Sequence, residues 1–269
     1  MNEIVYIAEL DQDIDDVIAA EYLYKMNVLK CVVLDPIPKT KEGVERKKSL
    51  ENLGIEVRTK MPPIAKYVFV GGALTSVASY ITTHKVSYLI MNGGFVGNNL
   101  VKQPLKKFQD KRECRTFNFN CDVIAADKVL KSKNIDNIML IGKNVCHDRR
   151  NTPLNIWKNE KELFDKYQVN DTKLQHDMLA CKEGLIELGL IDEESLLEYQ
   201  IVQPYNLGLN GTQTLWGSEL PNEKNQYRKV KSAIKWKWTW WFYFFCLKII
   251  YFILNFKYLC DKIKKKGVK

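Results

Sequence analysis

Five acidic residues lie close together near the amino terminus of the chain. Within one stretch of eight residues the sequence carries Glu9, Asp11, Asp13, Asp15 and Asp16. Like charges at this spacing repel, so a folded protein keeps such a cluster when it is solvated, caps a helix or is neutralised by a cation. One or two acids are enough for a helix cap. Five favour a site for a hard divalent cation, Ca²⁺ or Mg²⁺, which prefers oxygen ligands.

The elements around these acids alternate between strand-like and helix-like patterns. The acids follow the apolar segment IVYIAEL and open a segment of helical periodicity, DDVIAAEYLYKM. This alternation predicts a three-layer α/β/α domain around a mainly parallel open sheet, with ligands at the carboxyl ends of the strands. We expect strands over 4–10, 29–35, 55–59, 67–72, 86–94 and 137–144, and helices over 15–26, 44–54, 73–81, 122–132 and 172–190.

Further polar motifs follow the later strands. In chain order with ELDQDIDD they are GALTS, MNGGFVGNN, TFNFNCD and QHD. The set resembles the inosine-uridine preferring nucleoside hydrolase family, whose motifs are D-x-D-x-x-x-D-D, G-x-L-T-N, M-G-G with a following G-N, E-F-N and a late H-D. The resemblance covers residues 3–220 and implies the fold of that family. It also implies hydrolysis of the N-glycosidic bond of a ribonucleoside or related ribosyl compound, which gives free base and ribose for purine and pyrimidine salvage.

The resemblance assigns roles to individual residues. One Ca²⁺ would be held by Asp11, Asp16 and Asp177. The main-chain oxygen of Thr75 would be a further metal ligand. Asp11 would also be catalytic, because it would accept the proton of the attacking water. The ribosyl substrate would be bound at the positions that match the family's substrate-binding residues, which are Asp15, Met91, Asn98 and Asn118.

His176 matches the family residue that protonates the departing base. A nucleobase anion is a poor leaving group, and an imidazole titrates near neutrality, so it suits this second catalytic role. A lone histidine on a helix more often faces solvent. The neighbouring Asp177 and the acidic loop favour the catalytic interpretation. We expect His84 to lie at the surface and His147 to be structural.

The chain departs from the family pattern at several positions. Glu9 stands for the first Asp, Thr116 for the Glu of E-F-N, and Ser76 for the Asn of L-T-N. Gln12-Asp13 replaces the usual Pro-Gly between the acids. The short segment 60–66 stands where the family usually carries an insertion with residues that cover the base. The motifs of the sugar end are therefore better kept than those of the base end.

Two other functions fit parts of the sequence. A non-catalytic nucleoside or sugar binding protein on the same fold would bind the ligand without releasing base and ribose. A haloacid dehalogenase-like phosphatase also begins with Asp-x-Asp after a strand, and Lys143 could supply the lysine of that class. The later acidic pair of that class is missing from the sequence, which makes the phosphatase the weaker alternative.

The net charge of the chain, +9, is concentrated at one end. Residues 222–269 hold 13 lysines and arginines against two acids, so residues 1–221 are close to neutral. A near-neutral domain lacks the basic surface that phosphate backbones require, so we expect no nucleic-acid partner. We divide the chain into a nucleoside hydrolase-like domain, 1–221, and a basic, aromatic, membrane-associating tail, 222–269.

The tail contains an apolar stretch, 238–256, that is long enough for a transmembrane helix. Basic residues flank it on both sides, which also fits a hydrophobic helix in the interface of an anionic membrane. The seven cysteines form no C-x-x-C pair, and the first residues do not resemble a signal peptide. We therefore expect the domain on the cytoplasmic side of a membrane, or free in the cytoplasm if the tail packs on it. The sequence is also compatible with a homo-oligomer.

Overall fold

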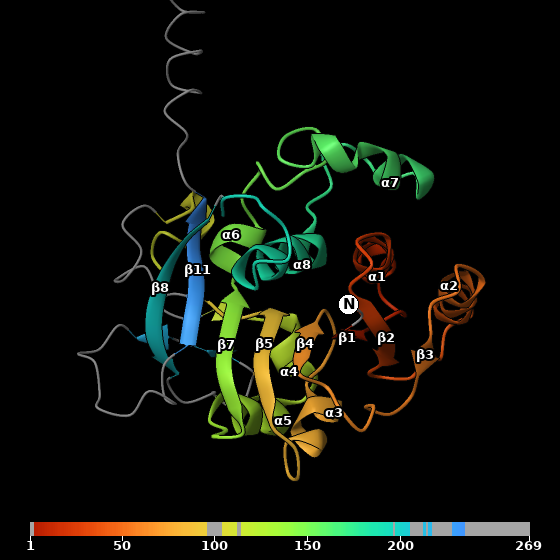
Figure 1. The fold of residues 1–269 in the computed structure, drawn as a ribbon. Helices are drawn as coiled ribbons and strands as arrows, with labels where there is room; N and C mark the ends of the chain where they lie inside the picture. The colour runs from red at the N-terminus through yellow and green to blue at the C-terminus, as the bar shows by residue number, and fades with distance from the viewer. Residues whose placement is uncertain are drawn as a thin grey trace, which may run out of the picture. The chain divides into compact units, whose positions relative to one another are not determined.

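The computed structural model describes residues 3–95, 104–111 and 114–195, and the strands formed by 197–204, 212–213, 215–216 and 228–234. Figure 1 shows these residues as a sheet with helices around it. One compact unit runs from Met1 to Ile234, and Lys235–Lys269 form a second unit that lies outside the described residues. The hydrophobic helix expected over 238–256 therefore also lies outside them. Among the described residues, no helix is both long and apolar enough to cross a membrane.

The main sheet has the strand order β10-β8-β11-β7-β5-β4-β1-β2-β3. Neighbouring strands from β11 to β3 are parallel, and β8 and β10 add antiparallel pairs at one edge. The parallel strands are β1 (Ile4–Ala8), β2 (Leu29–Leu34), β3 (Val57–Arg58), β4 (Tyr67–Val70), β5 (Val86–Asn92), β7 (Ile135–Ile141) and β11 (Arg228–Ile234). The others are β8 (Leu197–Pro204) and β10 (Leu215–Trp216), and a separate pair joins β6 (Cys114–Arg115) to β9 (Thr212–Gln213).

Helices connect the strands in the order that a parallel sheet requires. They are α1 (Asp15–Lys25), α2 (Lys41–Asn52), α3 (Thr75–Tyr80), α4 (Phe117–Cys121), α5 (Val123–Leu130), α6 (Lys143–Cys146), α7 (Lys161–Lys166) and α8 (His176–Glu187). Two single turns of 3₁₀-helix, η1 (Lys106–Phe108) and η2 (Lys158–Glu160), complete the described elements. The expected three-layer α/β/α fold with a mainly parallel sheet is confirmed.

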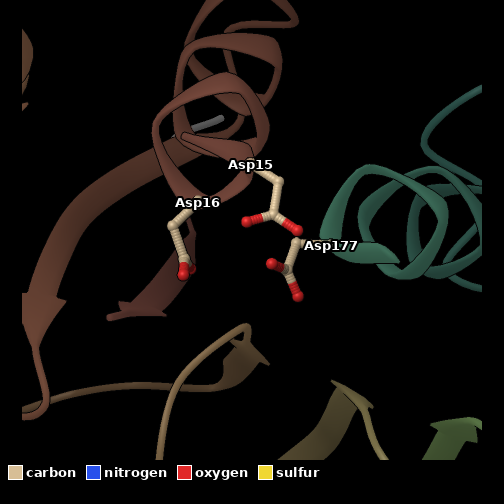
Figure 2. Close-up of side chains that lie close together, drawn as sticks. All are labelled: Asp15, Asp16 and Asp177. Carbon is tan, nitrogen blue, oxygen red and sulfur yellow. The ribbon is translucent and has the colours of Figure 1, made fainter. Parts of the chain in front are cut away.

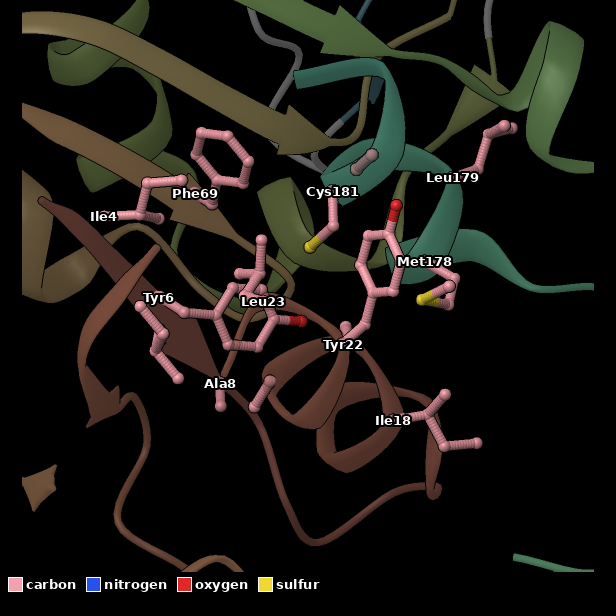
Figure 3. Packing of buried hydrophobic residues seen from close by; sticks show 14 of the residues in the cluster. Ile4, Tyr6, Ala8, Ile18, Tyr22, Leu23, Phe69, Met178, Leu179 and Cys181 are labelled. Atoms are coloured by element: carbon pink, nitrogen blue, oxygen red, sulfur yellow. The ribbon is translucent and has the colours of Figure 1, made fainter. Parts of the chain in front are cut away.

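The interior strand β1 has every side chain buried, because helices cover both faces of the sheet. Ile4, Tyr6 and Ala8 face one core, which also contains residues of α1 and α8 (Figure 3). Val5 and Ile7 face the other core, with residues of α3 and α5. The alternation follows from the period of two along a strand. Helices α1 and α8 pack on the same face of the sheet, so their first turns lie on the same side of it.

A glycine sets the position of α8 on the sheet. A Cβ atom at Gly184 would lie 2.6 Å and 2.7 Å from ring carbons of Phe69 in β4. Only glycine allows the helix to approach this buried ring so closely. Helix α8 consequently packs on β4, β5 and α1, and its first residues reach the carboxyl edge of the sheet.

One strand falls within the stretch that charge and composition grouped with the tail. Arg228–Ile234 form β11, which pairs with β7 in parallel and with β8 in antiparallel orientation. The compact unit therefore continues to Ile234, beyond the expected boundary at 221. A count of charges does not detect such a strand, because strand pairing is made by the backbone.

Candidate functional site

Three carboxylates meet at the carboxyl edge of the sheet. Asp15 and Asp16 begin α1, and Asp177 is the second residue of α8. One oxygen from each lies within 4.8 Å of the others, and Figure 2 shows the three side chains pointing toward one another. All three are almost fully buried. This arrangement could hold a metal ion.

Neighbouring polar groups hold the three carboxylates in place. The hydroxyl of Tyr6, from the middle of β1, donates a 2.6 Å hydrogen bond to Asp16. The side-chain amide of Asn92, at the end of β5, donates a 3.0 Å hydrogen bond to Asp177. The backbone amide of Asp15 donates a 2.8 Å hydrogen bond to Asp13, which fixes the start of α1. The carboxylates of Asp16 and Asp177 thus each accept a hydrogen bond from a strand residue, and Asp15 is held through the backbone at the start of α1.

The electrostatics of the cluster favour a bound cation. Burial raises the pKa of Asp15, Asp16 and Asp177 well above the ordinary value of an aspartate. The second cause is a neighbouring charge in each case: Asp177 acts on Asp15, Asp15 on Asp16, and Asp16 on Asp177. A divalent cation would remove both penalties, because it replaces solvation and cancels the repulsion. An all-oxygen donor set fits a hard ion.

A glycine makes room for this cluster. A Cβ atom at Gly71, directly after β4, would lie 2.2 Å from Oδ1 of Asp16 and 2.3 Å from the hydroxyl of Tyr6. The carbonyl of Gly71 accepts a 2.7 Å hydrogen bond from the side chain of Asn118, which also donates to the carbonyl of Asn92 at 2.8 Å. Asn118 thereby joins the ends of β4 and β5 below the carboxylates.

These residues surround a pocket of about 210 Å³. This volume is below the ~300–1,000 Å³ of sites for drug-sized ligands and suits a group of the size of a sugar. The pocket lining contains mostly residues with polar side chains. It consists of Glu9, Gln12, Asp13, Asp15, Asp16, Gly71, Asn92, Phe117, Asn118, His176 and Asp177.

The similarity of this chain to known proteins lies in its structure. No family model matches its sequence, and no curated protein matches it. Its structure is similar to the crystal structure of an inosine-uridine preferring nucleoside hydrolase from Bacillus anthracis, with a TM-score of 0.52 and 15% sequence identity. The match covers 86% of this chain and 94% of that chain. The chain has the nucleoside hydrolase fold. At this identity the likeness shows the fold alone, so any chemistry must be argued from the site.

His176 lies in the lining of the pocket on this nucleoside hydrolase fold. Its ring packs against that of His147, with centroids 5.1 Å apart. Its Nε2 is buried and has no hydrogen-bond partner among the described residues. Burial lowers the pKa of His176 to about 4; the charge of Asp13 opposes this shift, and the charges of three lysines add to it. His176 is therefore mainly neutral at pH 7 in this environment.

Asp11 does not belong to the carboxylate cluster. Its side chain turns toward the start of α2, where it accepts hydrogen bonds of 2.9 Å from the amide of Lys39 and 2.7 Å from the hydroxyl of Thr40. Free amides near a helix start attract a carboxylate, which explains this placement. Among the described acids, Asp15 takes the place beside Asp16 and Asp177 that the resemblance gave to Asp11.

The other expected site residues divide into two groups. Asp15, Asn118 and His176 line the pocket. Thr75 is exposed, and its hydroxyl donates a 3.0 Å hydrogen bond to Asp122. Met91 is fully buried in the core on the opposite face of the sheet. Asn98 lies outside the described residues. Neither Thr75 nor Met91 lines the pocket as described.

Sequence reasoning missed some residues of the site. Asn92 contacts Asp177 directly, and Phe117 and Gly71 complete the lining. Glu9 organises the acidic loop, because its carboxylate accepts hydrogen bonds from the amides of Asp11 and Gln12, at 2.8 Å and 3.1 Å. The signal that identifies Asn92 is its position, since a polar residue at the end of a buried parallel strand faces the ligand edge.

Replacing Asp16 with Asn tests the electrostatics of the cluster. The raised pKa values favour the protonated carboxyls, so without divalent ions the contribution of the cluster to stability should fall as the pH rises from 4 toward 8. Ca²⁺ should then raise the melting temperature more at pH 8 than at pH 5, by at least about 2–4 °C, the effect of about 1 kcal/mol in a domain of this size. Asp16→Asn should reduce both the fall in stability with rising pH and the gain in melting temperature from Ca²⁺.

The control for this experiment is Asp136→Asn, which alters an exposed carboxylate on β7. It should behave as the unmodified chain does. Thermal melts followed by circular dichroism measure both variants. A Ca²⁺ effect that is the same at both pH values and survives in Asp16→Asn would show that the ion binds elsewhere.

Proposed function

We propose that this chain hydrolyses the N-glycosidic bond of a ribonucleoside or related ribosyl compound with the help of one bound Ca²⁺. The observation that supports this most is the buried group of Asp15, Asp16 and Asp177 in a sugar-sized pocket at the carboxyl edge of a nucleoside hydrolase fold. A bound Ca²⁺ would hold two hydroxyls of the sugar and lower the pKa of a water molecule in the site.

The residues of the pocket suit the sugar end of the substrate. Cleavage of an N-glycosidic bond builds positive charge on the ribosyl group, and fixed carboxylates stabilise this charge in a site that excludes water. Asn92 and Asn118 border the same pocket and can form hydrogen bonds with hydroxyls. The attacking water needs a proton acceptor. Asp15 is better placed for this than Asp11, whose carboxylate is occupied by the amides before α2.

His176 is the residue best placed to protonate the leaving base. It lies in the lining next to Asp177, and its buried Nε2 has no other partner among the described residues. Such an acid acts only in its protonated form. Because burial lowers its pKa to about 4, the acid becomes more abundant as the pH falls below 7.

A binding protein for nucleosides or sugars is the second candidate. The placement of Asp11 favours it, because the loop acid that the resemblance made catalytic is held away from the pocket by Lys39 and Thr40. A protein of this kind would bind ribosyl compounds with the same carboxylates. It would release no ribose.

Hydrolysis can be measured directly with the full-length chain. Incubation with a panel of ribonucleosides and Ca²⁺ should release reducing sugar, and a chelator should abolish the release. Asp177→Asn should lower the rate by at least about 100-fold, because it removes one ligand and one charge from the site. Asp136→Asn should keep the full rate. Binding of nucleosides without release of sugar would support the binding protein instead.

Two kinds of substrate separate the acid role of His176 from a structural one. Nucleosides need a proton on the departing base, whereas nitrophenyl ribosides release nitrophenolate, which is stable as an anion. His176→Ala should therefore reduce kcat for nucleosides by about 10²–10⁴-fold and for nitrophenyl ribosides far less. The ratio of the two rates is the measurement. Equal losses on both substrates would exclude His176 as the acid.

We also propose that the chain binds anionic membranes through residues 235–269 and works on their cytoplasmic side. This segment carries nine lysines and one acid, together with a dense aromatic run. Full-length protein should sediment with vesicles that contain phosphatidylserine and less with pure phosphatidylcholine. High salt should release an interfacial segment and leave a spanning one in place. Protein that stays in the supernatant with both vesicles would contradict the proposal.

A further inference from the structure

A row of aromatic rings begins at His176 in the pocket lining and continues into buried phenylalanines. The ring of His147 lies 5.1 Å from that of His176, and the ring of Phe108 lies 5.8 Å from that of His147. Phe95, after β5, packs on Phe108 at 5.1 Å. The rings thus connect the sugar-sized pocket to η1 and the end of α6.

Two lysines flank these rings. Nζ of Lys107 lies 5.0 Å from the ring centroid of Phe108. Lys143 is the first residue of α6, and its carbonyl accepts a hydrogen bond from the backbone amide of His147. Lys143 therefore lies one helical turn before His147, on the same side of the helix. The two lysines belong to different elements, and the charges of both lower the pKa values of the two imidazoles.

No carboxylate neutralises these two lysines within the described part of the chain. Other lysines near the site are paired: Lys173 lies 3.3 Å from Asp13, and Lys182 lies 2.7 Å from Glu160. Burial and the charge of Lys143 lower the pKa of Lys107. Both lysines also contribute to a lowered pKa of His147, which is about 3 and has burial as its first cause. Their charges therefore act on each other and on the imidazoles.

Two cations that have no ion-pair partner among the described residues, and that act on a histidine of the pocket lining, raise the local concentration of anions and favour an anionic group on the ligand. The carboxylate cluster on the other side of His176 would repel such a group unless a metal is bound, so the two ends of the site differ in charge. A ligand that fits both ends carries hydroxyls at one end and negative charge at the other.

We propose that the ligand of this site is a ribosyl compound whose aglycone is negatively charged, and that Lys107 and Lys143 bind this charge. The assignment rests on the proposed function, which places the sugar at the carboxylates and the aglycone at His176. The chemical class is a ribosylated nitrogen base that bears a carboxylate. The cations also stabilise negative charge on the base as it departs.

Calorimetric titration of full-length protein in Ca²⁺ tests this proposal. The probes are uridine, orotidine, which adds a carboxylate to the base, and uridine 5′-monophosphate, which adds a phosphate to the sugar. Orotidine should bind about tenfold more tightly than uridine, because it gains charge-assisted contacts. The difference should shrink between 50 mM and 500 mM salt.

The double variant Lys107→Gln/Lys143→Gln should lose the difference between orotidine and uridine. Lys106→Gln is the matched control, because it removes an adjacent exposed charge of the same segment and should keep the difference. Equal binding of orotidine and uridine by the unmodified chain, or an unchanged difference in the double variant, would overturn the proposal. So would tighter binding of the 5′-monophosphate alone, which would place the recognised charge on the sugar.

Free orotate and free uracil separate this proposal from the proposed function. Orotate should bind to the unmodified chain about tenfold more tightly than uracil does and more tightly than it binds to the double variant, whether or not any nucleoside is hydrolysed. Absence of orotate binding would count against the lysine site. Absence of ribose release in the nucleoside panel, with orotate bound, would count against the hydrolase alone.

Discussion

The mutual repulsion of Asp15, Asp16 and Asp177 is the constraint around which this edge of the fold is organised. Three carboxylates without water or a cation oppose burial, yet all three are nearly inaccessible to solvent. Tyr6 and Asn92 offset part of this cost through hydrogen bonds. Gly71 contributes by having no side chain where Asp16 and Tyr6 need space. These hydrogen bonds and this space allow the three carboxyl groups to lie close together.

The sequence was sufficient to predict the architecture because the period of hydrophobicity is local information. The segment IVYIA is apolar throughout and becomes the fully buried β1, and the acids after it begin α1 as expected. The late H-D motif could be placed at the start of a long helix for the same reason. What brings Asp177 to Asp15 is the close approach of α8 to Phe69, and no spacing along the chain encodes that distance.

The expected site residues that lie away from the pocket show where local patterns stop being informative. Asp11 is drawn to amides 28 and 29 residues away, at the start of α2, and the acidic loop alone does not reveal this competition. Met91 and Asn92 are adjacent on β5, so their side chains point to opposite faces. Met91 enters the core beneath α3 and α5, and Asn92 reaches Asp177. The sequence M-N-G-G is one residue longer than the family motif M-G-G. A shift of the alignment by one residue therefore exchanges Met91, a core position, for Asn92, a pocket position.

Because His176 and Asp177 are consecutive residues of α8, peptide geometry fixes the separation of their Cα atoms. Asp15 and Asp16 belong to a different helix, α1, which packs against α8. Any sliding of one helix along the other would change the distances across the carboxylate cluster while the histidine and its neighbour travelled together. The stiffness of the α1–α8 contact therefore determines how well the cluster could bind an ion. The backbone relation between His176 and Asp177 is insensitive to such motion.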